Sequence, residues 1–282
     1  MSKRRLWMVL ALCATAASGA VLIQLGTPKL FVPPSRLTRP EQARHFLFRE
    51  IQPVKLANCE LERFGESHDG GYLLCGNLLG EAKSGYSYGI SGYDGWGCDV
   101  SRKLGITVHE YDCFDPTRPL CEGGNTVFHD ECIGTAAGLQ EGRPFDTLAG
   151  QFAKNGDSGK NLIVKMDVEG AEWDSFINAP AEVLQQIDQL AVEFHGFDEP
   201  RHSIAIVRLK HFFHVAHLHW NNHSCDKGKA PFPAWAYEVL LVNKRIGVVD
   251  PSGKPVLPHP LDAPNKRAAA DCQVFTTEES RR

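Results

Sequence analysis

Strand-like and helix-like segments alternate along most of this 282-residue chain, and this alternation constrains the fold more than any other feature. Short apolar runs rich in β-branched residues predict strands, and apolar residues at helical spacing predict helices between them. The expected strands are Gly85–Ser91, Thr107–Phe114, Thr126–Ile133, Leu162–Asp167, Gln189–His195, His214–Trp220 and Tyr237–Asn243. The expected helices between them are Asp99–Leu104, Asp146–Asn155, Ala171–Phe176, Ala181–Gln186 and His202–Phe212. Such alternation is typical of an α/β fold, in which helices cover both faces of a mostly parallel sheet.

The connection between the last two expected strands lacks a helical pattern. Residues 221–236 contain Pro and Gly instead of a regular apolar spacing. Parallel neighbours in a sheet need a long crossover, which is usually a helix. We therefore expect the final strand to run antiparallel to its neighbours.

The N-terminus predicts a membrane anchor. Lys3, Arg4 and Arg5 precede Leu6–Leu25, a run without a charged residue that is long enough to cross a bilayer as a helix. The positive-inside rule then predicts a single-pass protein with its body in the lumenal or extracytoplasmic space. The alternative is a signal peptide cleaved after small residues such as Ala16 or Ala20, which predicts a secreted protein.

The rest of the chain divides into a stalk, a domain and a tail. Residues 26–55 carry several prolines and one short amphipathic helix, Glu41–Ile51, and the α/β domain is expected over residues 56–246. Residues 247–282 are polar and rich in Pro, which predicts a loosely ordered tail. The net charge of −4, without a basic stripe in the domain, argues against a nucleic-acid partner.

The nine cysteines fit an exported protein. Eight of them follow the apolar run, and in an oxidising compartment they can form disulfides, although sequence does not give the pairing. No cysteine and histidine spacing matches a structural zinc site. Cys113 belongs to a strand-like run, where a buried free thiol is the expected state.

Two features predict a nucleotide-like ligand at the ends of the first two strands. The first strand ends in a glycine loop that contains Gly89, Ser91 and Gly92, where a ligand can approach the backbone closely. The second ends near Asp115, a position that holds ribose hydroxyls in nucleotide-binding α/β folds. Asp112 is the other candidate for the ribose-binding acid. The alternative for the glycine loop is a plain tight turn, and the alternative for Asp115 is an ordinary Asp-Pro turn. The chain has no phosphate-binding P-loop and no G-x-S-x-G elbow.

Polar residues two positions apart follow three later strands. They are Asp167 and Glu169, Glu193 and His195, and His219 and Asn221. Residues at this spacing share one side of a strand, so adjacent parallel strands bring them to one edge of the sheet. Such a set suits a general base for a hydroxyl, or a divalent cation bound by oxygen and nitrogen. The alternative is that the histidines near residue 219 are ordinary surface or core residues.

These motifs, in this order, resemble the FkbM-type methyltransferases, which are class I enzymes that depend on S-adenosylmethionine. The resemblance rests on DGGYLLC, YSYGISGYDGWGCD, VHEYDCFDP, VKMDVEGAEW, VEFH, HWNN and YEVLLVNK, and it covers about residues 56–244. The chain looks most like the subgroup that contains methyltransferase-like protein 24. The resemblance implies a Rossmann-like sheet of seven strands in the order 3-2-1-4-5-7-6, with strand seven antiparallel.

The resemblance also implies site residues. Gly89, Ser91, Gly92 and Asp115 match the positions that bind S-adenosylmethionine. Asp167 and Glu169 match the end of strand four beside the methyl group. Together with the strand-end pattern above, this places the expected base or metal ligands among Asp167, Glu169, Glu193 and His195. The resemblance favours O-methylation of a hydroxyl on a small molecule, and the exported compartment alone suggests a glycan as the acceptor. Two alternatives remain: a non-catalytic binding module on the same fold, and a nicotinamide-dependent oxidoreductase.

Overall fold

The computed structural model describes residues 39–273. The expected anchor at residues 1–25, most of the stalk before the first helix, and residues 274–282 lie outside this part of the chain. No helix within residues 39–273 is both long and apolar enough to cross a membrane. The prediction of a membrane anchor therefore concerns residues that the structure does not describe.

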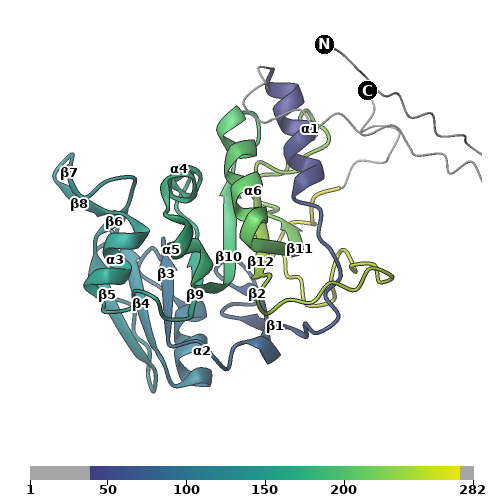
Figure 1. Cartoon of the computed structure of the whole chain (residues 1–282). Coiled ribbons are helices and arrows are strands. Elements are labelled where there is room, and N and C mark those ends of the chain that lie inside the picture. The colour runs from purple at the N-terminus through teal and green to yellow at the C-terminus, as the bar shows by residue number, and fades with distance from the viewer. Residues whose placement is uncertain (1–38, 274–282) are drawn as a thin grey trace, which may run out of the picture. The chain divides into compact units, whose positions relative to one another are not determined.

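A seven-stranded sheet forms the centre of the described chain (Figure 1). Its strands are β3 (Ser84–Tyr88), β4 (Thr107–Asp112), β5 (Asn125–Asp130), β9 (Leu162–Met166), β10 (Ile187–His195), β11 (Phe213–Trp220) and β12 (Ala236–Asn243). Across the sheet they lie in the order β5-β4-β3-β9-β10-β12-β11. Each expected strand is present, with ends that differ from the expectation by at most three residues. The mostly parallel α/β fold is confirmed.

β12 runs antiparallel to both of its neighbours, β10 and β11, as its helix-free connection predicted. The pairs β5–β4, β4–β3, β3–β9 and β9–β10 are all parallel. Because β12 is reversed, its beginning lies beside the ends of its neighbours. Glu238 of β12 pairs with Glu193 of β10 on one side and with His219 of β11 on the other.

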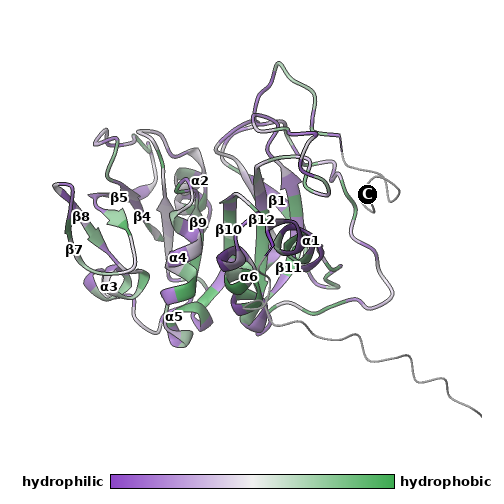
Figure 2. Ribbon diagram, turned by 90° about the horizontal axis from the view of Figure 1, so that it is seen from above, coloured by the Kyte–Doolittle hydropathy of each residue, from purple (hydrophilic) through white to green (hydrophobic). Residues whose placement is uncertain are grey.

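Two layers cover the sheet on opposite faces (Figure 2). One layer contains α1 (Pro40–Glu50), α3 (Leu148–Lys154), α4 (Ala171–Asn178), α5 (Ala181–Gln185) and α6 (Pro200–Phe212). The other contains α2 (Gly95–Leu104) and a two-stranded sheet of β1 (Leu61–Phe64) and β2 (Tyr72–Cys75). Alternate residues of β9 pack into different layers: Leu162 and Val164 join the first core, and Ile163 joins the second. A strand buried on both faces explains the continuous apolar run in the sequence.

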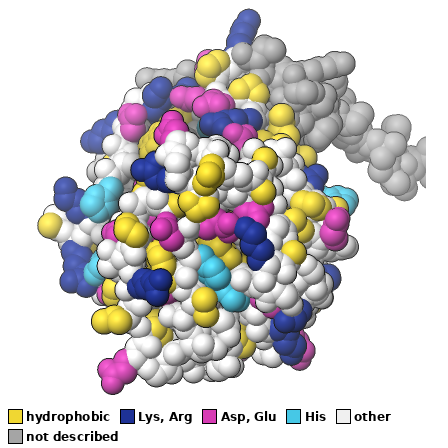
Figure 3. All heavy atoms as spheres, turned by 90° about the vertical axis from the view of Figure 1, so that its left-hand side faces the viewer, with side chains coloured by type: hydrophobic (Ala, Val, Ile, Leu, Met, Phe, Trp, Pro, Cys, Tyr) yellow, Lys and Arg dark blue, Asp and Glu magenta, His cyan; other side chains and the backbone are white. Residues whose placement is uncertain are grey.

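A small separate sheet follows β5, where the sequence predicted one uninterrupted strand through Ile133. The chain leaves the central sheet after Asp130, and β6 (Cys132–Ile133), β8 (Arg143–Asp146) and β7 (Gly138–Gln140) pair in that order. Figure 3 shows the face of the molecule on this side, where cationic and anionic side chains are interspersed. This mixed surface agrees with the small net charge of −4.

Four disulfides join the eight cysteines of the described chain. The pairs are Cys59–Cys75, Cys98–Cys121, Cys113–Cys132 and Cys225–Cys272. The prediction of a free thiol at Cys113 was therefore wrong. β4 ends at Asp112, so Cys113 lies in the turn beyond the strand, where Cys132 of β6 reaches it.

The segment from residue 247 to residue 273 packs against the sheet, whereas the sequence predicted a loosely ordered tail. Asn265 is buried, and its Nδ2 donates a hydrogen bond of 2.8 Å to Glu238 Oε1. Asn222 Nδ2 donates to the carbonyl oxygens of Lys266 and Ala269 at 3.1 and 3.0 Å, and Cys272 is disulfide-bonded. The polar composition predicted disorder because the segment has few apolar side chains to bury. The segment is held instead by hydrogen bonds and a disulfide, which composition does not reveal.

Candidate functional site

The ends of β9 and β10 bring ionisable side chains to one edge of the sheet. Met166 of β9 pairs with Val192 of β10, so the residues that follow, Asp167 and Glu193, come side by side. The reversed strand β12 adds Glu238 next to Glu193. This edge is where open α/β sheets bind their ligands.

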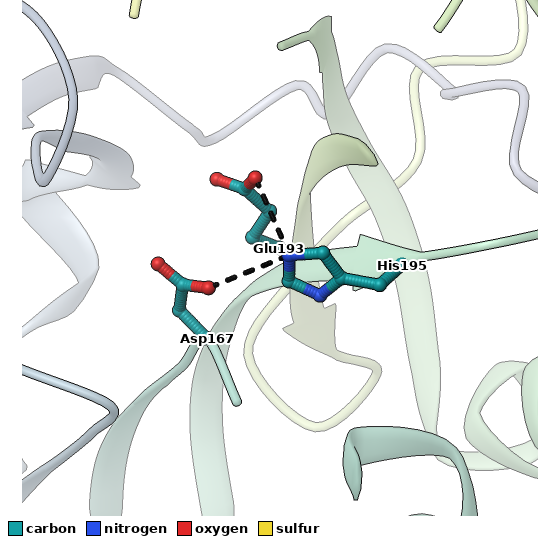
Figure 4. Close-up of side chains that lie close together, drawn as sticks. All are labelled: Asp167, Glu193 and His195. Atoms are coloured by element: carbon teal, nitrogen blue, oxygen red, sulfur yellow. Dashed lines mark ion pairs between the residues drawn. The ribbon is translucent and has the colours of Figure 1, made fainter. Parts of the chain in front are cut away.

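Asp167, Glu193 and His195 form a compact cluster at this edge (Figure 4). One ligating atom of each residue lies within 4.8 Å of the other two. His195 Nε2 is 3.7 Å from Asp167 Oδ1 and 3.6 Å from Glu193 Oε1. Glu169 Oε2 lies 3.5 Å from the same nitrogen, on a side chain that is 80% exposed. The structure thus brings together the four residues expected to form a catalytic site, whose role stays a prediction.

Glu172, in the first turn of α4, orients the His195 ring. Its Oε1 accepts the backbone N–H of His195 at 2.8 Å and lies 3.3 Å from His195 Nδ1. Its Oε2 accepts the backbone N–H of Gly170 at 2.8 Å. Because a carboxylate oxygen accepts hydrogen bonds, His195 Nδ1 is the donor in this contact, and His195 Nε2 faces Asp167 and Glu193.

Other side chains hold the two cluster carboxylates in place. The Tyr72 hydroxyl of β2 donates to Asp167 Oδ2 at 3.0 Å, and Asn221 Nδ2 donates to Glu193 Oε1 at 2.6 Å. Lys165 Nζ donates to the carbonyl oxygens of Tyr88 and Gly89, and it lies 3.9 Å from Asp167 Oδ2. Glu193 Oε2 is buried and has no hydrogen-bond partner within the described chain.

The crowding of carboxylates shifts the proton affinities in the cluster. Burial, together with the charges of Asp167 and Glu238, raises the pKa of Glu193 well above its usual value. Burial also raises the pKa of Asp167, against the opposing effect of Lys165 and His195. For His195, burial favours the neutral ring, but the hydrogen bond and charge of Glu172 outweigh it, so its pKa is raised. Perturbed ionisable groups of this kind are typical of functional sites.

The glycine loop after β3 lies against this cluster. Gly89 has φ 71°, and a Cβ atom at this residue would overlap the Asp167 carbonyl oxygen. The loop is fixed from β4, because Asp112 Oδ2 accepts the backbone N–H groups of Ile90 and Ser91 at 3.1 and 2.8 Å. Only glycine allows this close approach between the first strand end and the fourth.

The two candidate ribose acids have different surroundings. Asp112 Oδ1 accepts the backbone N–H groups of Phe114 and Asp115, at 2.8 and 3.0 Å, so both of its oxygens are occupied by backbone groups. Asp115 Oδ1 accepts the Thr117 N–H, and its Oδ2 lies 3.0 Å from the position of a Cβ on Gly92. The Thr117 hydrogen bonds hold the pKa of Asp115 below its usual value, so it is ionised at neutral pH. Asp115 is the acid that still has an oxygen for a ligand beside the loop.

The later histidines lie outside the cluster. His219 Nδ1 lies 3.3 Å from Glu238 Oε2, and His217 Nε2 lies 2.7 Å from Asp262 Oδ1. Asn221, by contrast, reaches Glu193. Sequence reasoning missed Tyr72 and Glu238 as members of this edge. A signal for Glu238 existed, because an acidic residue at the start of an antiparallel strand lies where its parallel neighbours end.

The donor set allows two kinds of chemistry at Asp167, Glu193 and His195. Carboxylates and an imidazole can accept the proton of a hydroxyl group. The same three side chains fit a divalent cation, and the Glu193 carboxylate keeps one buried oxygen without a hydrogen-bond partner in the described chain. The loop and Asp115 fit a nucleoside, because the glycines let a ligand approach the backbone closely and Asp115 Oδ2 lies beside Gly92.

No protein-family model matches this chain, and no curated protein matches it either. The geometry of this edge therefore carries the functional argument.

Proposed function

We propose that this chain is a methyltransferase that uses S-adenosylmethionine to methylate a hydroxyl oxygen. The observation that carries the proposal is the contact between Gly89 and Asp167, which joins the glycine loop to the acid–histidine cluster. A donor held at the loop and an acceptor held at the cluster would then face each other at one edge of the sheet. Placing two reactants in this way supplies much of the rate enhancement of a displacement reaction.

The sheet supports this assignment. Counted along the chain within the seven-stranded sheet, its strands lie in the order 3-2-1-4-5-7-6, and the seventh is antiparallel. This is the arrangement that the resemblance to class I methyltransferases implies. The site uses the ends of the first, second, fourth and fifth strands, which are β3, β4, β9 and β10.

Each part of the edge has a separate role in the proposal. Gly89, Ser91 and Gly92 hold the donor close to the backbone, and Asp115 accepts hydrogen bonds from its ribose. S-adenosylmethionine supplies the activated methyl group when it is bound there. Asp167, whose side chain is 22% exposed, and Glu169, at 80%, are open to an incoming hydroxyl. His195 and Glu193 are buried next to Asp167, and they help to take up the proton of the acceptor hydroxyl.

The disulfides and the N-terminal residues support an exported compartment in this proposal. Four disulfides favour an oxidising environment, as found in the secretory pathway. The basic residues before the apolar run favour a type II anchor, or a secreted protein if the run is cleaved. A small-molecule or glycan hydroxyl is the acceptor class that such a compartment offers.

Release of S-adenosylhomocysteine in the presence of candidate hydroxyl acceptors tests this function. Mass spectrometry of reactions with neutral glycans and small alcohols should show release by the wild-type chain. Asp167→Asn and His195→Ala should each reduce release at least about a hundredfold, the scale typical of a general base. Glu182→Gln, an exposed carboxylate on α5, is the matched control and should leave release unchanged. A chain that binds the donor but releases no product with any acceptor contradicts the enzymatic role and favours a binding module.

A further inference from the structure

Three acidic side chains crowd around the His195 ring. The side chains of Asp167, Glu172 and Glu193 are only 22%, 0% and 5% exposed, and each lies within 3.7 Å of a ring nitrogen of His195. Lys165 is the ammonium group in contact with this set, 3.9 Å from Asp167. If these three acids were all ionised and the His195 ring were neutral, three carboxylates and one ammonium would leave two negative charges in excess, which only added protons or a bound cation can neutralise. Charges so little exposed to water are costly unless they are paired or bind a metal.

The hydrogen bonds leave one free atom on each of three residues. Tyr72 occupies Asp167 Oδ2, Asn221 occupies Glu193 Oε1, and Glu172 faces His195 Nδ1. Asp167 Oδ1 and His195 Nε2 remain, and Glu193 Oε1, which faces His195 Nε2 at 3.6 Å, keeps a second lone pair. The other oxygen of the same carboxylate, Glu193 Oε2, is buried without a hydrogen-bond partner in the described chain, so this carboxylate is incompletely satisfied.

We propose that Asp167, Glu193 and His195 bind one divalent cation of the first transition row. A histidine that ligates a metal almost always donates its other ring N–H to a carboxylate or carbonyl, and Glu172 occupies this position. Tyr72 and Asn221 orient the ligating carboxylates in the same manner. The catalytic meaning of this site rests on the proposed function, but the binding itself depends on these side chains alone.

The mixed donor set indicates which ions fit. Carboxylates suit Mg²⁺, Ca²⁺ and Mn²⁺, whereas imidazole suits transition metals. Two carboxylates with one imidazole therefore favour an ion such as Mn²⁺ over Mg²⁺. Three protein ligands leave further positions open, and an acceptor hydroxyl bound there becomes more acidic.

The test is Mn²⁺ binding by the full chain, stripped with a chelator and free of donor and acceptor. Electron paramagnetic resonance measures the signal of free Mn²⁺ during a titration. The loss of this signal should correspond to one tightly bound Mn²⁺ per chain. Glu193→Gln and His195→Ala should each weaken Mn²⁺ binding more than tenfold. Glu172→Gln should weaken it by ten- to a hundredfold, as expected for a residue that hydrogen-bonds a metal-ligating histidine. Because no methyl donor is present, failure here is distinct from failure of the proposed function.

Glu182→Gln, an exposed carboxylate on α5, is the matched control. Its substitution should change Mn²⁺ affinity less than threefold, about 0.6 kcal/mol. Asp167→Asn, at a partly exposed position, serves if the buried variants fail to fold, as judged by circular dichroism. A wild-type chain that binds no Mn²⁺ at millimolar concentration overturns the proposal, and so does Mn²⁺ binding that survives all of the ligand substitutions.

Discussion

Gly89 and Asp167 lie so close that a single Cβ atom on the glycine would overlap the Asp167 carbonyl oxygen. The contact joins the end of β3 to the end of β9, 78 residues later in the chain. Gly89 also adopts φ 71°, a conformation that other residues rarely take. The position therefore combines a backbone requirement with a steric one, and both serve to bring the loop against the acid–histidine cluster.

Gly89→Ala should lower the free energy of unfolding by about 3 kcal/mol or more, because strain at positive φ adds to an overlap with backbone that cannot move away. Gly123→Ala is the control, since Gly123 has φ 77° and nothing within 4 Å of an added Cβ. It should cost only about 1–2 kcal/mol, for the positive φ alone. Urea unfolding of the oxidised proteins measures both values. Equal losses in the two variants would show that the contact with Asp167 contributes nothing.

Asp115→Ala should weaken S-adenosylmethionine binding ten- to a hundredfold, the usual effect of losing a charge-assisted hydrogen bond. The fold should survive, because the Asp115 side chain hydrogen-bonds only locally, to Thr117, within residues 39–273. Asp112→Ala should instead lower stability, because four backbone N–H groups of the two loops lose their acceptor. Calorimetric binding and thermal unfolding of both variants separate the two roles. Wild-type affinity in Asp115→Ala would move the ribose contact elsewhere.

Glu110 should make stability depend on pH. Its side chain is buried in β4, and burial together with the charge of Asp94 raises its pKa from 4.5 to about 8. The folded state therefore holds this proton more tightly than the unfolded state does. The resulting stability is complete below pH 4.5 and is lost as the pH rises through about 8.

Glu110→Gln should accordingly remove this loss, so that the variant exceeds the wild type by up to a few kcal/mol at pH 8 and by little at pH 5. Urea unfolding at the two pH values measures the difference. Glu182→Gln, on the surface of α5, is the control and should follow the wild type at both. A Glu110→Gln variant that parallels the wild type across this range would contradict the raised pKa.

The sequence could predict the cluster because its members follow parallel strands. Asp167, Glu193 and His195 come directly after or at the end of apolar runs, and strand ends of this kind meet at one edge. Glu238 could also have been predicted from the antiparallel direction of β12, which the sequence indicated. Its position needed the register with Glu193 as well, and register depends on tertiary packing.

Tyr72 and Asn265 lay beyond sequence reasoning for a different reason. Tyr72 comes from a separate small sheet and meets Asp167 across 95 residues of chain. Asn265 belongs to the segment that composition marked as loosely ordered, yet it donates to the buried Glu238. Both contacts are made by polar side chains between elements, and no local periodicity encodes such contacts.

Calorimetric titration of the full chain with S-adenosylmethionine, S-adenosylhomocysteine and NAD tests the central claim most directly. We predict that the first two bind with one site per chain and compete with each other, and that NAD produces no binding heat. Binding of NAD without S-adenosylmethionine would favour an oxidoreductase. A folded chain that binds none of the three would contradict the assignment of the glycine loop and Asp115 to a nucleoside donor.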